Sequence, residues 1–541
     1  MHRKRRSQLP VLLLAIFAVT VTLLTASVLA QFPDKTRNPN AANEGINKSL
    51  TQQIGAGRGN ATTVDSSAYI IARDPFRAIR RGRQLFQRKF LMGEGLGPIT
   101  GEGDGKTDIG TDLIIGAGLA DSCAACHGLP RGSAGAGGDV VTRPDSRNAP
   151  HLFGLGLKEM LADEITAELR AIREDAIDEA RDRRRNITKT LRTSSGKGNI
   201  NYGSITARPN GSVDTSDVEG VDPDLRVRPF FLHGDTMSIR EFIVGALNAE
   251  MGLEAVDPDM RNAERFGGRR IVTPSGMVLD GRVDRIEQPA VEHENHDSDF
   301  DGRVNEIPTS LVDFMEFYLL HYFKAGTGES SPDATSGRNS FTSLGCAACH
   351  IPNLTINRDR RVADVETVFD PVQGNPLNRL FATATPFFTE VNDPGNFPTL
   401  KRPNFGSFLV RNIFTDFKRH DLGPNFHERN FDGTMRTQFL TTALWGVGTT
   451  PSYGHDGRSH DLKTVILRHG GEAQQARDNF ASASQSTQRN VIAFLNTLIV
   501  FAPDDTASNL QPADPNTPGY PQFGHGSIRL TALFNNTGDV E

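Results

Sequence analysis

The sequence predicts a mainly α-helical protein in which two domains pack together and carry inserted loops and helices. The pentad Cys-Ala-Ala-Cys-His occurs twice, at residues 123–127 and 346–350, and each copy follows a similar short segment. Apolar residues recur at helical spacing in several windows between and after the pentads. A chain of 541 residues that is 37% hydrophobic fills two cores more readily than one very large one. We expect the domains to cover residues 75–330 and 331–503.

Residues 1–30 have the pattern of an export signal. Basic residues 3–6 precede an apolar run over residues 12–29, and small residues follow near Ala30. We expect cleavage before Gln31 and a periplasmic mature protein. The alternative is an uncleaved membrane anchor, although hydroxyl-bearing residues dilute the run as a spanning helix.

Two flanking regions are expected to lie outside the domains. Residues 31–74 are rich in Asn, Gly, Gln and Thr without a sustained apolar period, which predicts an irregular leader. Residues 504–541 are rich in Pro and Asn and are expected to form a surface tail. The net charge of -6 and the even spread of Lys and Arg argue against a nucleic-acid partner and are compatible with a charge-steered protein partner.

The segment before each pentad is weakly repeated. Residues 82–86 read GRQLF and residues 337–341 read GRNSF. We expect each copy to open a domain in the same way. A Gly-rich stretch over residues 93–118 separates the first copy from its pentad, so the first domain is predicted to carry an extra loop.

Three further segments have helical periodicity. From Lys158 to Leu191 the chain is rich in Ala, Glu and Arg, with Leu and Ile at helical spacing. This pattern predicts one long, mostly solvated helix or a helical hairpin, with the arginines on a polar face. Residues 311–323 and 488–501 are predicted to be amphipathic helices that close the first and the second domain.

Each pentad has the arrangement that attaches one haem covalently. Two thiols one helical turn apart can reach the two vinyl groups, and the next residue presents an imidazole to the iron. The predicted attachment residues are Cys123, Cys126, Cys346 and Cys349, and the predicted proximal ligands are His127 and His350. A bare Cys-x-x-Cys also occurs in redox disulfides and zinc sites, but here His follows it in both copies. All 4 cysteines lie in the pentads, so no structural disulfide is predicted.

The second axial ligand of each iron decides the chemistry, because a six-coordinate haem transfers electrons whereas an open iron can bind peroxide or oxygen. The chain has 14 histidines. Besides the proximal ligand, the second domain offers His420, His427, His455, His460 and His469. The distal ligand must therefore be assigned for each haem separately.

These features resemble the bacterial dihaem cytochrome c peroxidase superfamily, and most closely its di-haem oxidoreductase branch. The resemblance covers residues 75–503 and implies two cytochrome c-like haem domains. It is carried by LWGVG at 444–448, HDGR at 455–458, HGGEA at 469–473, TDF at 415–417, HDLG at 420–423 and GLGP at 95–98.

The resemblance implies that the C-terminal haem receives the electrons. The family's distal ligand to this haem is Met or Tyr, and His469 occupies that position here. Ligation by two histidines would keep the haem low-spin and lower its potential relative to a His/Met pair. The alternative is that His469 packs at a helix end. His455 is expected to support the haem or the domain interface from the second shell.

The resemblance also implies that the N-terminal haem carries out the reaction. The family's acid/base glutamate lies in a Glu-Met pair that Glu250-Met251 matches. A carboxyl over the iron can take a proton from peroxide and return it to the departing oxygen. The alternative is an exposed helical glutamate.

Three positions depart from the family pattern. No histidine lies between His127 and His151, although the family has its distal His there, so we expect an open or differently capped iron. Whether His151 or His233 turns onto this iron is left open. Leu232 stands at the position of the family's relay tryptophan, and the single tryptophan, Trp445, lies elsewhere. Phe242 stands at the position of the glutamine that accompanies the catalytic glutamate, which makes the pocket more apolar.

Calcium is the expected metal ion besides iron. Residues 297–306 space carboxylates two apart with Gly at the sixth position, which suits a hard cation, and the alternative is an acidic surface turn. The candidate ligands of this loop are Asp297, Asp299, Asp301, Asn305 and Glu306. The resemblance implies a second calcium between the haem domains, with Asn148, Thr450 and Ser452 at the matching positions.

The expected function is that of a periplasmic haem-dependent oxidoreductase that reduces hydrogen peroxide. The electron donor would be a small cytochrome c or a cupredoxin, as the resemblance implies. Two alternatives are an electron-transfer cytochrome without catalysis and a relative that oxidises an organic substrate or a protein. The apolar Leu232 and Phe242 are compatible with the latter.

Overall fold

The computed structural model describes a large part of the chain. The described residues are 49–73, 75–97, 120–128, 134–137, 139–140, 147–265, 267–288, 293, 295–297, 302–321, 326–328, 330–361, 365–370, 382–388, 406–429 and 433–503. Among them, no helix combines the length and the hydrophobicity needed to cross a membrane. The predicted export signal, much of the Gly-rich stretch and the predicted tail lie outside these residues.

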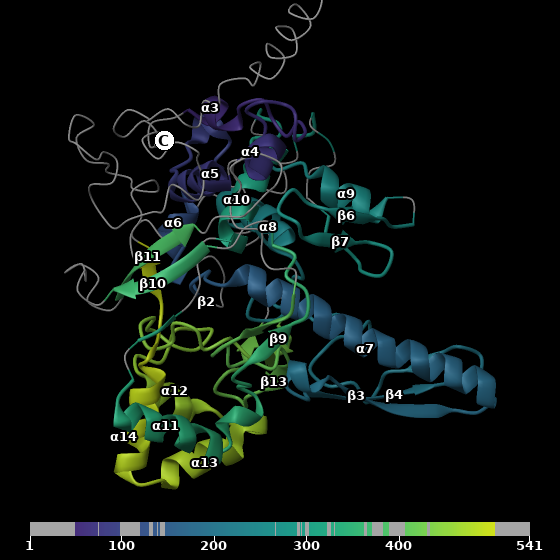
Figure 1. Ribbon diagram of the computed structural model, residues 1–541, viewed down its shortest axis with the longest axis vertical. Helices are drawn as coiled ribbons and strands as arrows, with labels where there is room; N and C mark the ends of the chain where they lie inside the picture. Colours follow the sequence, from purple (N-terminus) through teal and green to yellow (C-terminus); the bar gives the residue numbers. More distant parts are fainter. Residues whose placement is uncertain are drawn as a thin grey trace, which may run out of the picture.

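Helices make up most of the regular structure, because 40% of the described residues are helical and 14% are in strands. The first pentad lies in an upper lobe and the second in a lower lobe (Figure 1). The upper lobe contains α3 (Leu50–Ile54), α4 (Ser67–Arg73), α5 (Pro75–Gln87), α6 (Cys123–His127), α8 (Ile239–Met251), α9 (Pro258–Glu264) and α10 (Thr309–His321). The lower lobe contains α11 (Pro332–Ser343), α12 (Leu462–Arg468), α13 (Gln474–Ser482) and α14 (Gln485–Leu495).

The strands form small sheets of two or three members. The pairs are β1 (Asp139–Val140) with β2 (Arg147–Asn148), β6 (Arg270–Val272) with β7 (Val278–Asp280), β8 (Gly326–Thr327) with β17 (Leu498–Ile499), β9 (Leu354–Ile356) with β12 (Phe408–Val410), β13 (Arg419–Asp421) with β16 (Gln438–Leu440), and β14 (Glu428–Arg429) with β15 (Met435–Arg436). The three-stranded sheets are β3 (Ile187–Arg192), β4 (Asn201–Ala207) and β5 (Val213–Asp214), and β10 (Val365–Asp370), β11 (Ala382–Phe388) and β18 (Phe501–Pro503). Only β11 and β18 pair in parallel among these strands.

The repeated segments open the two lobes in the same way. Helix α5 crosses α10 at Gly82, where a Cβ would collide with the carbonyl oxygen of Phe314. Helix α11 crosses α14 at Gly337, where a Cβ would collide with the carbonyl oxygen of Asn490. Glycine is needed at both crossings because the backbones approach closely. The helix before each pentad thus packs on the last helix of its own lobe.

The long helix is shorter than its periodicity predicts. Helix α7 covers Leu155–Arg183, and the chain then continues into β3 instead of remaining helical to Leu191 or forming a helical hairpin. Arg184 adopts a left-handed conformation that ends the helix. In the following segment Ile187 is buried and Thr188 is exposed, and this alternation is typical of a strand. Its β-branched residues also favour a strand.

The two closing helices differ from the prediction in their burial and length. Helix α10 is buried on every face from Ser310 to His321, so it is a central core helix and not an amphipathic one. Helix α14 is amphipathic but ends at Leu495, and the next apolar residues form β17 with β8. The apolar run to Phe501 was interpreted as helix because short apolar strands and helices share composition.

The part of the leader that the structure describes is folded. Ser49 and Gln52 form a capping box at the start of α3, and α4 contributes Ile70 and Ile71 to the core. Arg58 forms an ion pair with Asp259, which ties the leader to α9. The expectation of an irregular leader is wrong for this part. Its apolar residues show little periodicity in the sequence, yet Ile70 and Ile71 are buried in the core.

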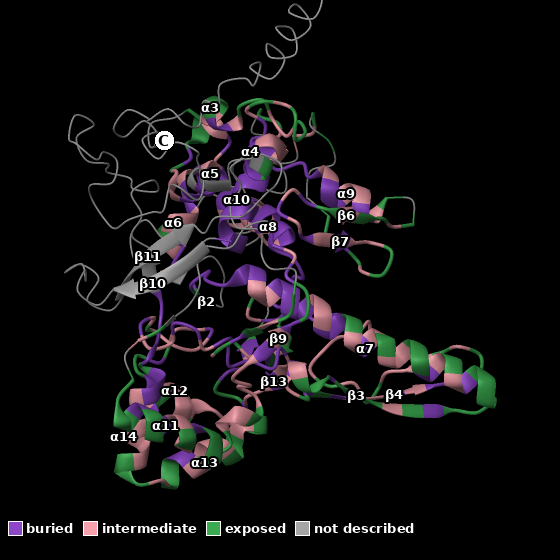
Figure 2. Cartoon of the chain, in the orientation of Figure 1, coloured by how far each residue is buried: buried purple, intermediate pink, exposed green. Residues whose placement is uncertain are grey.

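Buried apolar residues form two clusters. In the cartoon of Figure 2, α8 and α10 of the upper lobe are coloured mostly as buried. The larger one centres on α5, α8 and α10 and also includes residues beyond 331, among them Leu354 and Trp445. The smaller one joins α11 and α14 around Phe341 and Phe494. Residues beyond 331 therefore contribute to both clusters, and this shared packing holds the two lobes together.

A buried ionic cluster holds the upper lobe together. The guanidinium of Arg240 on α8 is 0% exposed and pairs with four carboxylates, of which Asp259 is the most distant at 3.7 Å. The three closest are Asp257 at 2.7 Å, Asp313 at 3.0 Å and Glu316 at 2.9 Å, from the start of α9 and from α10. One cation thus fastens three elements of the core.

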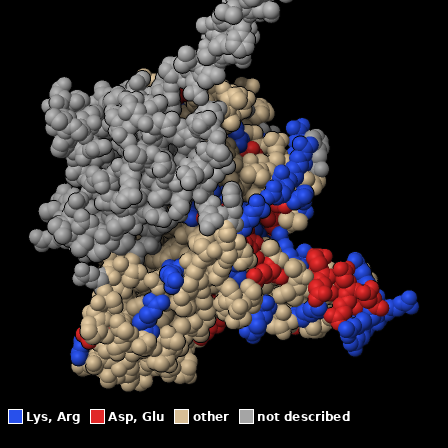
Figure 3. Space-filling model, in the orientation of Figure 1, with Lys and Arg blue, Asp and Glu red and all other residues tan. Residues whose placement is uncertain are grey.

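Helix α7 and the sheet of β3, β4 and β5 project from the body as an arm (Figure 1). Acidic and basic side chains are intermixed on it (Figure 3). Lys189 pairs with Glu179 at 3.0 Å, and Arg183 pairs with the same carboxylate at 3.0 Å. These pairs support the interpretation of the arginines as a polar face.

Candidate haem sites

The first pentad forms the short helix α6. Ser122 caps it by accepting a hydrogen bond from the backbone N–H of Ala125 at 3.1 Å. Gly137 lies so close to the carbonyl of Cys126 that no Cβ would fit there. His127 donates from Nδ1 to the carbonyl oxygen of Pro150 at 2.7 Å. Burial lowers the pKa of His127 to about 4, so the imidazole is neutral, as an iron ligand must be.

The second pentad lies in a 3-10 turn, Cys346–Ala348, that follows α11. His350 donates from Nδ1 to the carbonyl oxygen of Phe414 at 3.1 Å. Burial, and then the charge of His469, lower the pKa of His350 to about 4. Phe341, Phe414 and Phe494 pack against one another near this imidazole, with ring centroids 5.5 to 5.8 Å apart.

The two proximal histidines have equivalent surroundings. The last residue of each repeated segment packs near one of them, with Phe86 at 6.5 Å from His127 and Phe341 at 6.0 Å from His350 between ring centroids. Each Nδ1 is fixed on a backbone carbonyl, which sets the tautomer and leaves Nε2 as the atom for an iron. The residues present therefore fit a haem at both pentads.

The thiols are not those of a redox disulfide. All four cysteines are free in the structure. Burial raises the pKa of Cys123 to about 12 and of Cys346 to about 11, and burial with the charge of Glu250 raises the pKa of Cys126 to about 11. Redox and zinc-binding cysteines have lowered pKa values, so these alternatives are disfavoured.

His469 faces the second pentad. It follows the last residue of α12 and donates from Nδ1 to the carbonyl oxygen of Val465 at 2.7 Å. Phe426 holds the other side of the ring, with centroids 5.4 Å apart. Its charge acts on His350, as stated above, so the two imidazoles lie on one pocket. This placement is compatible with a bis-histidine haem.

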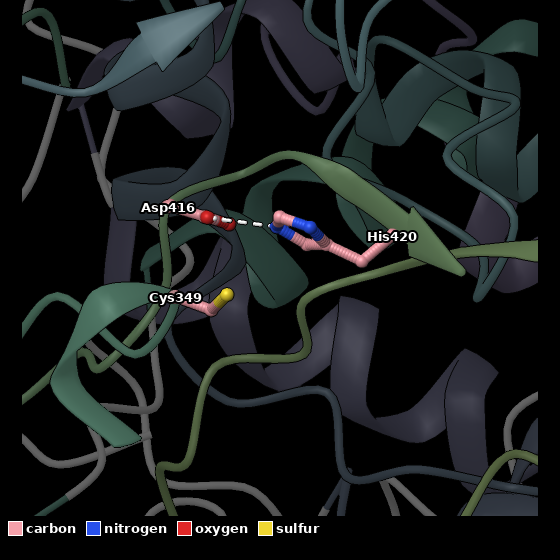
Figure 4. A group of neighbouring side chains, drawn as sticks. All are labelled: Cys349, Asp416 and His420. Carbon is pink, nitrogen blue, oxygen red and sulfur yellow. Dashed lines mark hydrogen bonds and ion pairs between the residues drawn. The ribbon is translucent and has the colours of Figure 1, made fainter. Parts of the chain in front are cut away.

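A charged histidine stands beside the second attachment site (Figure 4). Cys349, Asp416 and His420 each place one ligand atom within 4.8 Å of the others. His420 pairs with Asp416 at 2.9 Å and with Glu472 at 2.7 Å. Burial alone would lower its pKa, but hydrogen bonds to Asp416 and then to Cys349 outweigh burial and raise the pKa to about 11. As an imidazolium, His420 would donate hydrogen bonds from both ring nitrogens, to Asp416 and to Glu472.

Neither histidine considered for the first iron is available to it. His151 has its Nε2 on the carbonyl oxygen of Trp445 and its Nδ1 accepting from the N–H of Phe153 at 3.2 Å. His233 has Nε2 at 3.0 Å from Glu428 and Nδ1 at 3.3 Å from Asp235. Both rings are fixed by two partners, so neither one caps the iron of the first pentad.

His455 lies in a buried cluster between distant segments. Glu428, 6% exposed at its side chain, contacts His455 at 2.8 Å and His233 at 3.0 Å through different oxygens. Phe439 stacks on His455 with centroids 4.1 Å apart. The carbonyl of His455 also accepts from the N–H of Asn148 at 3.1 Å. His455 thus contacts both Asn148, in the segment after the first pentad, and Glu428, in the C-terminal part of the chain.

Glu250 lies at the end of α8, on the side of the first pentad. Its charge raises the pKa of Cys126, and its carbonyl accepts from the N–H of Ala120 at 3.4 Å. On the same helix, Phe242 packs on Phe231 with centroids 4.9 Å apart. Glu250 is therefore the carboxyl of α8 that lies close to the first pentad.

The loop of residues 297–306 is described only in part. Asp297 accepts from the N–H of Gly302 at 3.0 Å, and its second oxygen is buried without a hydrogen-bond partner among the described residues. Such an oxygen fits a cation ligand. Asn305 and Glu306 instead accept from the N–H groups of Val256 and Glu254, at 3.2 and 2.6 Å. Asp299 and Asp301 lie outside the described residues.

The residues of the second calcium site lie partly together. The amide of Asn148 donates to the carbonyl oxygen of Ser452 at 2.7 Å. The hydroxyl of Thr450 is turned to the carbonyl of Gly446 at 3.0 Å. Asn148 and Ser452 are thus brought together across the lobes, whereas Thr450 points into its own segment.

Sequence reasoning did not find the carboxylates that fix the histidines. Glu428 is the shared partner of two of them, and Glu472 and Asp416 hold His420. The only local signal was the i, i+4 spacing of Asp416 and His420. No pattern in the sequence connects Glu428 with His233, because the two lie far apart along the chain.

Comparison with known proteins agrees with this geometry. Residues 402–498 match the family described as "Di-haem oxidoreductase, putative peroxidase", which confirms the predicted resemblance. The match contains His420, His455 and His469, and both pentads lie outside it. No curated protein matches the chain.

A solved structure of Kuenenia stuttgartiensis hydrazine synthase is similar at 14% sequence identity, over 35% of this chain and 55% of that chain. The TM-score of 0.21 is too low for an argument about the fold. The chain thus spans about 55% of the length of that structure.

Proposed function

Because residues 402–498 match the di-haem oxidoreductase family, we propose that the protein is an exported dihaem c-type oxidoreductase that reduces hydrogen peroxide. Its electrons would come from a small periplasmic redox protein, a cytochrome c or a cupredoxin. The four pentad cysteines would hold the two haems covalently. When bound, each haem supplies an iron that changes oxidation state.

The two sites have different tasks in this proposal. His350 and His469 would both ligate the second iron, which suits electron entry because no position would be left for peroxide. His127 would hold the first iron, and His151 and His233 each have two other partners in this structure. This asymmetry is the observation that carries the proposal.

Glu250 is the proposed acid/base group. Its carboxylate would take the proton from the inner oxygen of hydrogen peroxide and return it to the outer oxygen, which leaves as water. The apolar side chains of Phe231 and Phe242 would limit water in the pocket and strengthen the carboxylate's effect.

Calcium is proposed as a structural ion. The buried oxygen of Asp297 is the observation that supports the loop site, and the contact of Asn148 with Ser452 supports the site between the lobes. Either ion would fix the positions of the segments that carry its ligands.

Spectroscopy of the purified protein, oxidised and half-reduced, tests the proposal. We expect two covalently bound haems, one high-spin and one low-spin, with the high-spin signal lost when peroxide is added. Glu250→Gln should slow the reaction with peroxide about a hundredfold, since general acid-base catalysis contributes ~10²-fold or more. Glu174→Gln on the exposed arm serves as the matched control and should react normally. Two low-spin haems whose spectra do not change on adding peroxide would refute peroxide reduction. They would indicate an electron-transfer protein without catalytic activity.

Oxidation of an organic substrate or a protein is the second candidate. Phe231 remains 44% exposed beside Phe242, so these two residues offer an exposed apolar surface to a substrate. Stable binding of oxygen to the reduced first haem would favour this candidate over peroxide reduction.

A further inference from the structure

The single tryptophan lies where the two lobes meet. Trp445 is 4% exposed, and its indole belongs to the larger core, which is centred on the upper lobe. The ring packs directly on Gly154, the residue before α7, where a Cβ would collide with it. Gly154 has φ 72°, so glycine is required there for its conformation as well as for space.

The backbone of Trp445 is bonded to the first haem site. His127 donates to the carbonyl oxygen of Pro150, and the next residue, His151, contacts the carbonyl oxygen of Trp445 through Nε2. Because Nδ1 of His151 accepts from Phe153, its proton lies on Nε2, which therefore donates. Hydrogen bonds and covalent bonds thus join the ligand of the first iron to Trp445.

The same segment is bonded to the second haem site. The N–H of Leu444 donates to the carbonyl oxygen of Ile413 at 3.1 Å. The following carbonyl, that of Phe414, accepts the hydrogen bond from His350 at 3.1 Å. Leu444 and Trp445 therefore stand between the two proximal histidines, with hydrogen bonds on either side.

We propose that the side chain of His151 and the backbone of Leu444 and Trp445 form the electron path between the two haems, since Leu232 offers no tryptophan for it. The inference rests on the proposed function, because it requires a haem at each pentad. One electron would leave the ferrous iron held by His350, which becomes ferric. The same electron would lower the oxidation state of the iron held by His127 by one. No bond forms or breaks and no proton moves. Trp445 serves as a bonded bridge and is not itself oxidised.

A second chain of rings offers the rival path. It runs from His469 through Phe426, His455 and Phe439 to His233, with centroid distances of 5.4, 5.9, 4.1 and 5.4 Å. This chain ends at His233, which is bonded to Glu428 and Asp235. The path through Trp445 ends at the ligand of the first iron, which is why we favour it.

The test is the rate of electron transfer between the haems after rapid one-electron reduction, for example by pulse radiolysis. His151→Leu removes the donor to the carbonyl oxygen of Trp445 and is expected to slow this rate about tenfold, which corresponds to ~1.4 kcal/mol of activation free energy. Trp445→Phe keeps that backbone carbonyl and should keep the wild-type rate. His151→Gln retains a donor to the carbonyl of Trp445 and should keep the wild-type rate. Phe439→Leu interrupts the rival path and should also keep it.

Haem content and the two reduction potentials are measured for every variant, so that a lost haem or a changed driving force is recognised. Wild-type protein without two covalent haems would refute the proposed function itself. With both haems present, a wild-type rate in His151→Leu would refute the electron path. A slow rate in Phe439→Leu alone would assign the transfer to the rival chain.

Discussion

Removal of the guanidinium at the centre of the buried ionic cluster should destabilise the upper lobe strongly. Arg240 is 0% exposed and lies 2.7 to 3.0 Å from Asp257, Asp313 and Glu316, which are at most 1% exposed. Arg240→Met would leave Asp257 and Glu316 buried without this cation, while Asp313 would keep only Arg58, at 3.7 Å. Breaking one buried pair costs roughly 3–5 kcal/mol, and here three carboxylates lose the same partner, so we expect about 5 kcal/mol at pH 8.

The loss should depend on pH. Burial raises the pKa of Glu316 to about 7 and also raises the pKa of Asp313, although Arg240 opposes both shifts. A carboxyl whose pKa is higher in the folded state binds its proton more tightly there. Its contribution to stability is therefore present at low pH and is lost as the pH rises through about 7. Without Arg240 these pKa values rise further, so the variant should lose more stability at pH 8 than at pH 6.

Urea unfolding at pH 6 and pH 8, followed by circular dichroism, measures both effects. Arg282→Met is the matched control, because Arg282 pairs with Asp280 on the surface, and its urea midpoint should not change. A loss for Arg240→Met below about 1 kcal/mol, or an equal loss at both pH values, would refute the reasoning, since a surface pair would behave in that way.

Other contacts lead to further predictions. Glu428→Leu should lower stability by about 3–5 kcal/mol because it leaves two buried histidines without their acceptor, whereas Glu428→Gln should cost less, and urea midpoints would distinguish them. His469→Met should raise the reduction potential of the second haem in a redox titration, and an unchanged potential would show that this residue is not the ligand. Gly337→Ala should cost about 1–3 kcal/mol by separating α11 from α14, as thermal unfolding would reveal. A calcium chelator should lower the melting temperature of the wild type but not of Asp297→Asn, and an equal decrease in both would count against calcium at this loop.

The proposed haem attachment could be inferred from the sequence because its signal is local. A thiol, a second thiol and an imidazole within five residues define a haem attachment site without knowledge of the fold. The repeated glycine and phenylalanine before each pentad were visible for the same reason. The structure then shows their tasks, which are the close helix crossing at Gly82 and Gly337 and the packing of Phe86 and Phe341 near the proximal histidines.

The interactions that fix the site were not predictable, because they join distant segments. Glu428 holds a histidine from each half of the chain, and Trp445 packs on Gly154 at the start of α7. Periodicity also failed where burial overrides it, as in α10, whose polar residues Asp313 and Glu316 are buried with Arg240. A polar residue in a helical pattern predicts an exposed face unless its distant partner is known.

The crossing of α5 and α10 has a consequence for the order of maturation. Helix α10 begins at Thr309, far beyond the pentad that begins at Cys123, so the upper lobe cannot close until the intervening chain has emerged. Contacts of such long sequence separation form slowly. While the chain is still open, the first pair of thiols would therefore remain accessible to a haem-attaching enzyme, which the proposed covalent attachment requires. The second pentad directly follows α11, and its lobe closes only with α14, so the same window exists there. Cofactor attachment would thus precede folding in both halves.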